Sequence, residues 1–226
     1  MIRRLAVIPA ARLHLALMLA LTFSTGVIDA VGYLGLDRVF TGNMTGNVVI
    51  LGMALTGADD LPVLGPVLAL AGFMAGAAAG GRVLRTARPG WTGRTTLLFA
   101  AVGAVMAAVG VLLLAFSSGL AHPAVVSTTT VLAAAMGVQA ATARFLAVKD
   151  VTTVVVTSTI TGLAADSVLG TRQGGDSARR AAAIVLILVG ALVGAAVLEL
   201  SLGAGVAVSA VVTLLVALVG HLHARA

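Results

Sequence analysis

The sequence predicts an all-α membrane protein, a polytopic helical bundle of about six full spans with two broken, re-entrant segments in inverted repeats. Three observations predict this class: a composition poor in charge, a series of apolar segments, and the placement of Arg and Lys. The 226-residue chain is 60% hydrophobic and 10% charged, whereas ordinary globular domains carry about 25% charged residues. So few charges cannot cover a water-soluble fold, and apolar surface must face lipid.

The same composition excludes several function classes. The chain has no cysteine, so disulfides and cysteine-ligated metals are excluded. Its basic residues lie in short loops between apolar runs, a pattern typical of membrane topology signals rather than of nucleic-acid binding. The histidines are scattered or terminal, and no nucleophile elbow or phosphate-binding loop is present. We therefore expect no enzyme activity, no cofactor, no metal and no nucleic-acid partner.

Eight apolar segments follow one another along the chain, most of them near the length of about 20 residues that spans hydrocarbon as a helix. They cover residues 13–36, 39–58, 62–81, 95–118, 123–145, 151–170, 181–200 and 202–221. A signal peptide is the alternative for the basic and apolar start of the chain. Because the apolar stretch runs past a cleavage point, we expect the first helix to remain.

The distribution of positive charge selects between eight and six spans, because cytoplasmic loops are enriched in Lys and Arg. With eight spans, seven of the 14 Lys and Arg residues fall on each side. If 39–58 and 151–170 each enter and leave on one side, 13 become cytoplasmic and only Arg38 is external. The sequence therefore predicts six spans in the bacterial inner membrane, with both termini cytoplasmic.

An internal repeat supports this topology. Three matches occur in the same order: "VFTGNMTG" at 39–46 with "VVTSTITG" at 155–162, "GVIDA" at 26–30 with "GVQAA" at 137–141, and "GFMAGAA" at 72–78 with "GALVGAA" at 190–196. We predict a single transmembrane domain over 1–226, with repeats at about 13–118 and 123–221. Three full spans per repeat is an odd number, so the second repeat is inverted, as in many transporters.

Two helices carry small residues at helical spacing, at Gly72 and Gly76 and at Gly190 and Gly194. Such faces let helix backbones approach closely in lipid. Packing inside the bundle is the favoured interpretation, and a homodimer interface is the alternative.

The two broken segments hold the densest groups of small polar residues. We expect their chains to reverse near residue 48 and near Thr161-Gly162, at the deepest point. Irregular backbone there must be buried in protein or line a water-filled cavity. The amides and hydroxyls therefore either satisfy freed backbone groups or line a solute path. The candidate lining residues are Asn43, Thr45, Asn47, Thr157 and Thr161, and the candidate turn glycines are Gly42, Gly46 and Gly162.

Asp29 is the only charged residue well inside a predicted full span. A carboxylate at that depth costs on the order of 3 kcal/mol or more, which marks a functional site. We expect it to face the interior, toward Asn43 and Asn47 or toward Gln139. It is interpreted as a proton or cation site; the alternative is a hydrogen-bonded Asp that fixes helix packing. Asp166 is a second candidate, but an interfacial, solvated position is the favoured interpretation for it.

The runs "GVIDAVGYLGLDRVFTGNMTGNVVILG", "AMGVQAATARF" and "TSTITGLAADS" resemble the YoaK family of small bacterial inner-membrane proteins, a domain of unknown function. The resemblance covers nearly the whole chain and implies about six spans, but it implies no substrate. The family pattern points to Asp29, Asn43, Thr45, Gly46, Asn47 and Gln139.

These observations predict a transporter or channel for a small solute or ion, with the lipid bilayer as its surroundings. The alternative is a non-transporting assembly or regulatory protein that acts through helix–helix contacts.

Overall fold

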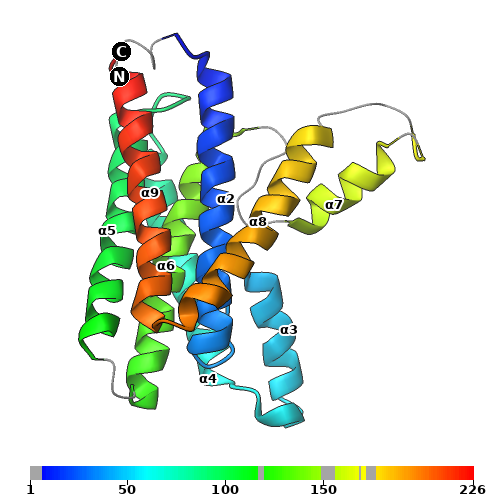
Figure 1. Cartoon of the computed structure of the whole chain (residues 1–226), viewed down its shortest axis with the longest axis vertical. Coiled ribbons are helices and arrows are strands. Elements are labelled where there is room, and N and C mark those ends of the chain that lie inside the picture. Colours follow the sequence, from blue (N-terminus) through cyan, green and yellow to red (C-terminus); the bar gives the residue numbers. More distant parts are fainter. Residues whose placement is uncertain (1–6, 117–119, 149–155, 168, 172–176) are drawn as a thin grey trace.

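The computed structural model describes residues 7–116, 120–148, 156–167, 169–171 and 177–226, and within these ranges all regular structure is helical. Six helices are long and apolar enough to cross a membrane (Figure 1). They are α2 (Ala10–Gly35), α4 (Leu64–Leu84), α5 (Gly93–Ala115), α6 (His122–Leu146), α8 (Ser177–Leu198) and α9 (Leu202–Ala224). The prediction of six long spans is confirmed.

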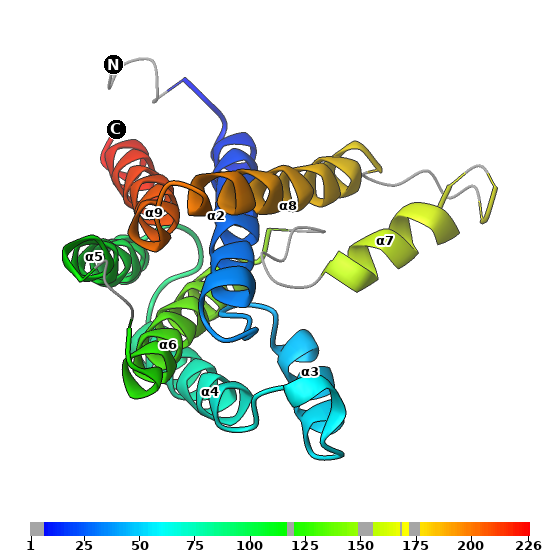
Figure 2. The ribbon, with the colours of Figure 1, turned by 60° about the horizontal axis from the view of Figure 1, so that its bottom comes forward.

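The other two predicted segments contain short helices, α3 (Met44–Ala54) and α7 (Val156–Ala165). Each has 10 or 11 residues and reaches only about 15 Å, half of a bilayer core. In Figure 1, α3 runs down to the end opposite the termini, whereas α7 runs obliquely outward from the bundle and upward. Figure 2 places both on the side of α2 away from α5 and α9.

The first broken segment reverses earlier than its sequence suggests. Residues 36–43 return toward mid-height as irregular chain, and the turn η1 (Ala58–Asp60) follows α3 at the lower end (Figure 1). The Asn43 side chain accepts a hydrogen bond from the Gly46 amide at 3.1 Å, and such a cap favours a helix that begins there. Gly46 therefore lies in the first turn of α3 rather than in a reversal near residue 48.

The second broken segment differs in the same way. Thr161 and Gly162 lie inside α7, not at a turn. The Thr161 hydroxyl donates to the Thr157 carbonyl at 3.0 Å, so this hydroxyl is satisfied within the helix. Residues 149–155, and with them Val155 of the sequence match, lie outside the described residues.

Glycines bring the long helices together in pairs. A Cβ on Gly76 of α4 would collide with the backbone of Ala134 on α6, and a Cβ on Gly190 of α8 would collide with the backbone of Phe23 on α2. These backbones therefore pack directly against each other, as small residues permit in lipid. The interpretation that the small-residue faces pack inside the bundle is confirmed.

Apolar side chains and a small polar contact hold the centre of the bundle. Ile28, Met106 and Met136 are fully buried in one cluster, which joins α2, α5 and α6. Between α2 and α9, the hydroxyl of Ser24 donates to the carbonyl of Ser209 at 3.3 Å, and the hydroxyl of Ser209 donates back to the Ser24 carbonyl at 3.1 Å. Each buried hydroxyl thus has a partner on the other helix.

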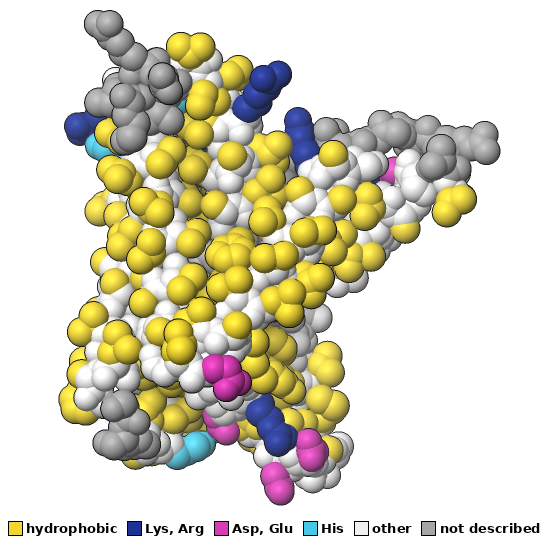
Figure 3. Space-filling view, in the orientation of Figure 1, with side chains coloured by type: hydrophobic (Ala, Val, Ile, Leu, Met, Phe, Trp, Pro, Cys, Tyr) yellow, Lys and Arg dark blue, Asp and Glu magenta, His cyan; other side chains and the backbone are white. Residues whose placement is uncertain are grey.

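Charge is segregated between the two ends of the bundle (Figure 3). Every described Arg except Arg38 lies at the end that holds both termini, by the directions of the helices in Figure 1. The opposite end carries Asp37, Asp59, Asp60 and Glu199.

The close glycine contacts predict a sharp difference between two substitutions on α4. Gly76→Ala would force α4 away from α6, an overpacking that costs about 1–3 kcal/mol. The matched control is Gly81→Ala, since nothing lies within 4 Å of a Cβ there. We expect the unfolding midpoint in detergent to fall for Gly76→Ala only. Equal midpoints for the two variants would contradict this packing.

The arrangement of the spans predicts which residues share a side of the membrane. Single cysteines can be introduced without background because the chain has none. Arg85→Cys and Thr171→Cys, both exposed at the terminal end, should react with an impermeant maleimide from one side, and Asp60→Cys from the other. Labelling of Arg85→Cys and Asp60→Cys from the same side would rule out this topology.

Candidate functional site

Asp29 holds the irregular chain before α3 in place. It lies on α2 and is 8% exposed. Its Oδ1 accepts hydrogen bonds from the backbone amides of Thr41 at 3.0 Å, Gly42 at 2.6 Å and Asn43 at 3.4 Å, and from the Thr41 hydroxyl at 3.3 Å. Backbone amides that converge on one oxygen form an anion-binding concavity. A single carboxylate oxygen therefore satisfies the amides that the broken helix leaves without helical partners.

Asn47 completes the support of the same loop. Its Oδ1 accepts from the Phe40 amide at 2.9 Å, and its Nδ2 donates to the Phe40 carbonyl at 2.7 Å. The side chain is fully buried. Because both ends of the Asn47 amide are used by the backbone of Phe40, this residue positions the loop and does not line the cavity described next.

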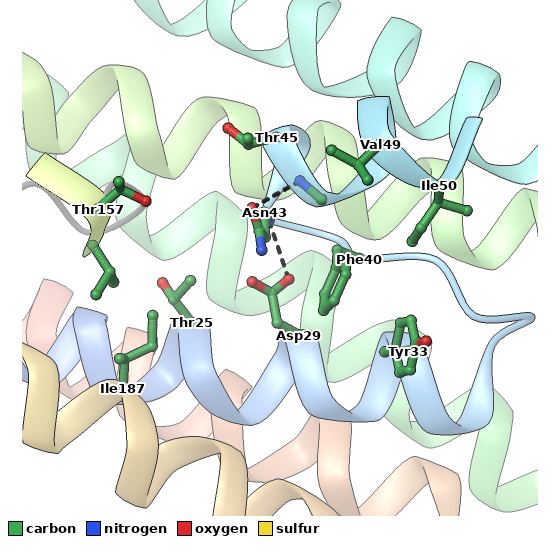
Figure 4. Close-up of a pocket in the computed structure, with 12 residues that line it drawn as sticks. Thr25, Asp29, Tyr33, Phe40, Asn43, Thr45, Val49, Ile50, Thr157 and Ile187 are labelled. Carbon is green, nitrogen blue, oxygen red and sulfur yellow. Dashed lines mark hydrogen bonds between the residues drawn. The ribbon is translucent and has the colours of Figure 1, made fainter. Parts of the chain in front are cut away.

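A cavity of about 470 Å³ lies beside Asp29 (Figure 4). Its walls come from four helices and one loop: Thr25, Asp29 and Tyr33 on α2, Phe40 and Asn43 in the loop before α3, Thr45, Gly46, Val49 and Ile50 on α3, Val156 and Thr157 on α7, and Ile187 on α8. The cavity therefore joins side chains from both short helices.

The two oxygens of Asp29 have different surroundings. Oδ1 faces the loop amides, whereas the other oxygen points toward Thr25 in Figure 4 and takes no hydrogen bond from the described residues. The Asn43 side chain is also partly used, because its Oδ1 accepts the hydrogen bond from Gly46 that caps α3. The carboxylate can thus hold the loop and still present an acceptor to the cavity.

Two sequence-predicted residues lie away from the cavity, in addition to Asn47. Gln139 is fully buried on α6, and its Nε2 donates to the Thr25 hydroxyl at 3.4 Å. Its Oε1 is buried and has no partner among the described residues. Thr161 lies further along α7 and is exposed. The structure thus brings Asp29, Asn43, Thr45, Gly46 and Thr157 together around the cavity. Gln139 does not line the cavity but contacts Thr25, which does.

The two remaining glycines have different surroundings. Gly42 packs against Asp29, Thr25 and Met136, whereas Gly162 packs against the guanidinium of Arg180 on α8. Arg180 also forms an ion pair with Asp166 at 2.6 Å. Asp166 therefore links the end of α7 to α8 and lies outside the lining of the cavity.

Thr25, Tyr33 and Phe40 line the cavity but were not predicted from the sequence. A signal for two of them exists, because Thr25, Asp29 and Tyr33 are spaced four residues apart and therefore share one face of a helix. Tyr33 is also the only tyrosine of the chain. Phe40 stacks on Tyr33, with ring centroids 4.8 Å apart and planes 21° apart; this contact crosses the loop and has no signal in the local spacing.

The role of Asp29 in the loop predicts a difference between two variants. Asp29→Ala removes the acceptor of three backbone amides, and buried amides without partners cost about 1–3 kcal/mol each. Asp29→Asn keeps an oxygen at this place. In detergent, the unfolding midpoint should fall strongly for Asp29→Ala and much less for Asp29→Asn. Similar midpoints for wild type and Asp29→Ala would show that the loop does not depend on this carboxylate.

Comparisons with known proteins place this bundle among membrane proteins. The family model described as "Protein of unknown function (DUF1275)" matches residues 17–219. The chain is 31% identical over 187 residues to UPF0700 transmembrane protein YoaK of Bacillus subtilis (strain 168), which covers 78% of this chain and 80% of the relative. No solved structure matches.

Proposed function

Because this chain belongs to the DUF1275 family of proteins of unknown function, we propose a function from its own site: a transporter or channel for a small solute or ion. The chain is an integral multi-pass membrane protein, as its six apolar spans and its transmembrane relative indicate. In the proposal, Asp29 is the binding or coupling group of the transported species.

The observation that carries the proposal is the cavity beside Asp29, which brings polar side chains of both short helices together among the long apolar helices. It combines the second oxygen of Asp29 with Asn43 and Thr45 from the first broken segment and Thr157 from the second. Irregular backbone and a buried carboxylate at this depth are costly unless protein or water surrounds them. A solute path gives both features a use that packing alone does not require.

An inverted repeat is part of the proposal, and the glycine contacts support it. Gly76 and Gly80 of α4 face Ala134, Val138 and Ala141 of α6, and Gly190 and Gly194 of α8 face Phe23, Val27 and Ala30 of α2. The glycines of the two sets lie 114 residues apart, and their partners lie 111 residues apart. The contacts therefore pair Gly76 with Gly190, whereas the sequence match of 72–78 with 190–196 pairs Gly72 with Gly190. The two alignments differ by four residues, about one helical turn.

The charge distribution supports the orientation of the protein. Because cytoplasmic ends of membrane proteins are rich in Arg and Lys, the end with both termini is assigned to the cytoplasm of a bacterial inner membrane. The first broken segment then opens to the outside and the second to the cytoplasm. Half-helices that meet near the midplane from opposite sides are a recurring plan of transporters.

The non-transporting alternative has less support from the fold. It depends on glycine faces that bind other proteins, but Gly76 and Gly190 pack against helices of the same chain. We therefore retain transport as the proposed function.

Flux through proteoliposomes tests the proposal. A panel of small amines, amides, carboxylates and monovalent cations is offered, and entry is followed by light scattering or by a trapped indicator. At least one class of solute should enter about tenfold faster than it enters protein-free vesicles. The Asp29→Asn variant should lower that entry rate by about tenfold.

Gly81→Ala, which changes a position with no neighbour within 4 Å, serves as the control and should transport at the wild-type rate. Absence of flux for every class would overturn the proposal. Wild-type flux through Asp29→Asn would remove Asp29 from the mechanism.

A further inference from the structure

Two hollows share one wall at Asp29. The polar cavity lies on one side, and on the other an apolar groove of about 430 Å³ runs between α2 and α8. Asp29, Tyr33, Phe40, Asn43 and Ile187 line both hollows. The rest of the groove is made of small and aliphatic side chains, among them Ala30, Leu188, Ala191 and Leu192. A ligand at Asp29 therefore meets polar groups on one side and hydrocarbon on the other.

The charged and aromatic groups at this wall favour a cation. Asp29 is the only charged side chain among the described residues that line either hollow. Tyr33 and Phe40 are half-buried and stacked beside it. Aromatic faces attract cations, more strongly where water is excluded, and a carboxylate attracts them over a longer range at low dielectric. An anion would instead meet one negative charge with no cationic side chain from these walls to balance it.

The shape of the site favours an organic cation over a bare metal ion. Hard ions such as Ca²⁺ take six to eight oxygen ligands. Among the oxygen-bearing side chains of the cavity wall, the Thr25 hydroxyl and the Asn43 Oδ1 already bond to backbone groups. The second oxygen of Asp29 and the hydroxyls of Tyr33, Thr45 and Thr157 remain, around a volume of about 470 Å³. An ammonium group needs only a few acceptors, and apolar substituents on it gain from the groove.

We propose that the transported species is a small organic cation, a primary or quaternary ammonium with apolar substituents, whose charged group pairs with Asp29 beside the Tyr33–Phe40 stack and whose apolar part lies in the α2–α8 groove. This inference rests on the proposed transport function and names its substrate class.

The acidic residues near the first broken segment agree with an organic cation as the substrate class. The end opposite the termini carries Asp37, Asp59, Asp60 and Glu199, and Arg38 is paired with Asp59 at 3.1 Å. Clusters of one sign raise the local concentration of ions of the other sign. Organic cations are therefore gathered at the end of the molecule from which the Asp29 loop enters.

Binding to the purified full chain tests the inference independently of flux. Choline and butylammonium are titrated by calorimetry, with 3,3-dimethylbutan-1-ol as the uncharged isostere of choline, butyrate as the anion, and potassium as the inorganic cation. Both ammonium probes should bind at least about tenfold more tightly than the other three. Equal binding of the isostere or of butyrate would overturn the inference, as would no binding of either ammonium probe.

Variants separate the charge from the aromatic wall. Asp29→Asn keeps an acceptor for the loop and should weaken choline binding by about tenfold or more. Tyr33→Leu should weaken choline several-fold and leave the isostere unchanged. The control, Gly81→Ala, changes a position outside both hollows with no neighbour within 4 Å, and it should bind choline as the wild type does. If Asp29→Asn fails to fold, Tyr33→Leu decides alone, and wild-type choline binding by Tyr33→Leu overturns the assignment.

The ammonium could come from a free solute or from a lipid headgroup, and nanodiscs distinguish these sources. In phosphatidylglycerol discs, choline should bind as in detergent. Weaker choline binding in phosphatidylcholine discs would assign the same site to the headgroup, and equal binding in both discs would assign it to a free cation.

Failure of the inference and failure of the proposed function are distinguishable. Asp29-dependent flux of a neutral solute or an anion, without ammonium binding, would overturn the cation and leave transport standing. Ammonium binding without flux of any solute would overturn transport and leave the cation site standing.

Discussion

The arrangement of the site depends on one interaction, the contact between the Asp29 carboxylate and the backbone amides of residues 41–43. A broken helix inside a bilayer leaves amides that water cannot reach, and each needs an acceptor. Asp29 supplies that acceptor from the neighbouring helix α2, and Asn47 closes the loop at Phe40. Apolar packing adds to these contacts, since Val39 is buried against Ala69 and Ala133 and Phe40 stacks on Tyr33.

From the sequence, Asp29 is interpreted either as a binding site or as a residue that fixes packing. The structure allows both roles for the same carboxylate. One oxygen of Asp29 fixes the loop, as a packing residue would, and the other borders the cavity, as a binding residue would. A carboxylate can serve both purposes because its two oxygens point in different directions. The second short helix is held differently among the described residues, because Asp166 after α7 forms an ion pair with Arg180 of α8.

Several features of the fold and site were predictable because they arise from composition or from spacing along one helix. Low charge and apolar length indicate the spans, the asymmetry of Arg and Lys indicates their number, and Gly76 and Gly190 mark close helix contacts. Asp29 stands out because an isolated charge in a span is costly. The two asparagine side chains were harder to assign: Asn43 and Asn47 lie four residues apart, yet Asn43 is exposed and borders the cavity, whereas Asn47 is buried against the backbone of Phe40.

By itself, the sequence determined the membrane class, the six spans, the small-residue packing faces and the position of Asp29, since these follow from hydropathy, charge and local periodicity. The tertiary structure alone decided where the chain reverses, which way each amide points, and that Thr25, Tyr33, Phe40 and Thr157 share a cavity with Asp29. The physical reason is that these outcomes depend on partners on other helices or across an irregular loop. A loop amide and its acceptor lie 12 to 14 residues apart, and Thr25 and Thr157 meet only through the packing of α2, α7 and α8.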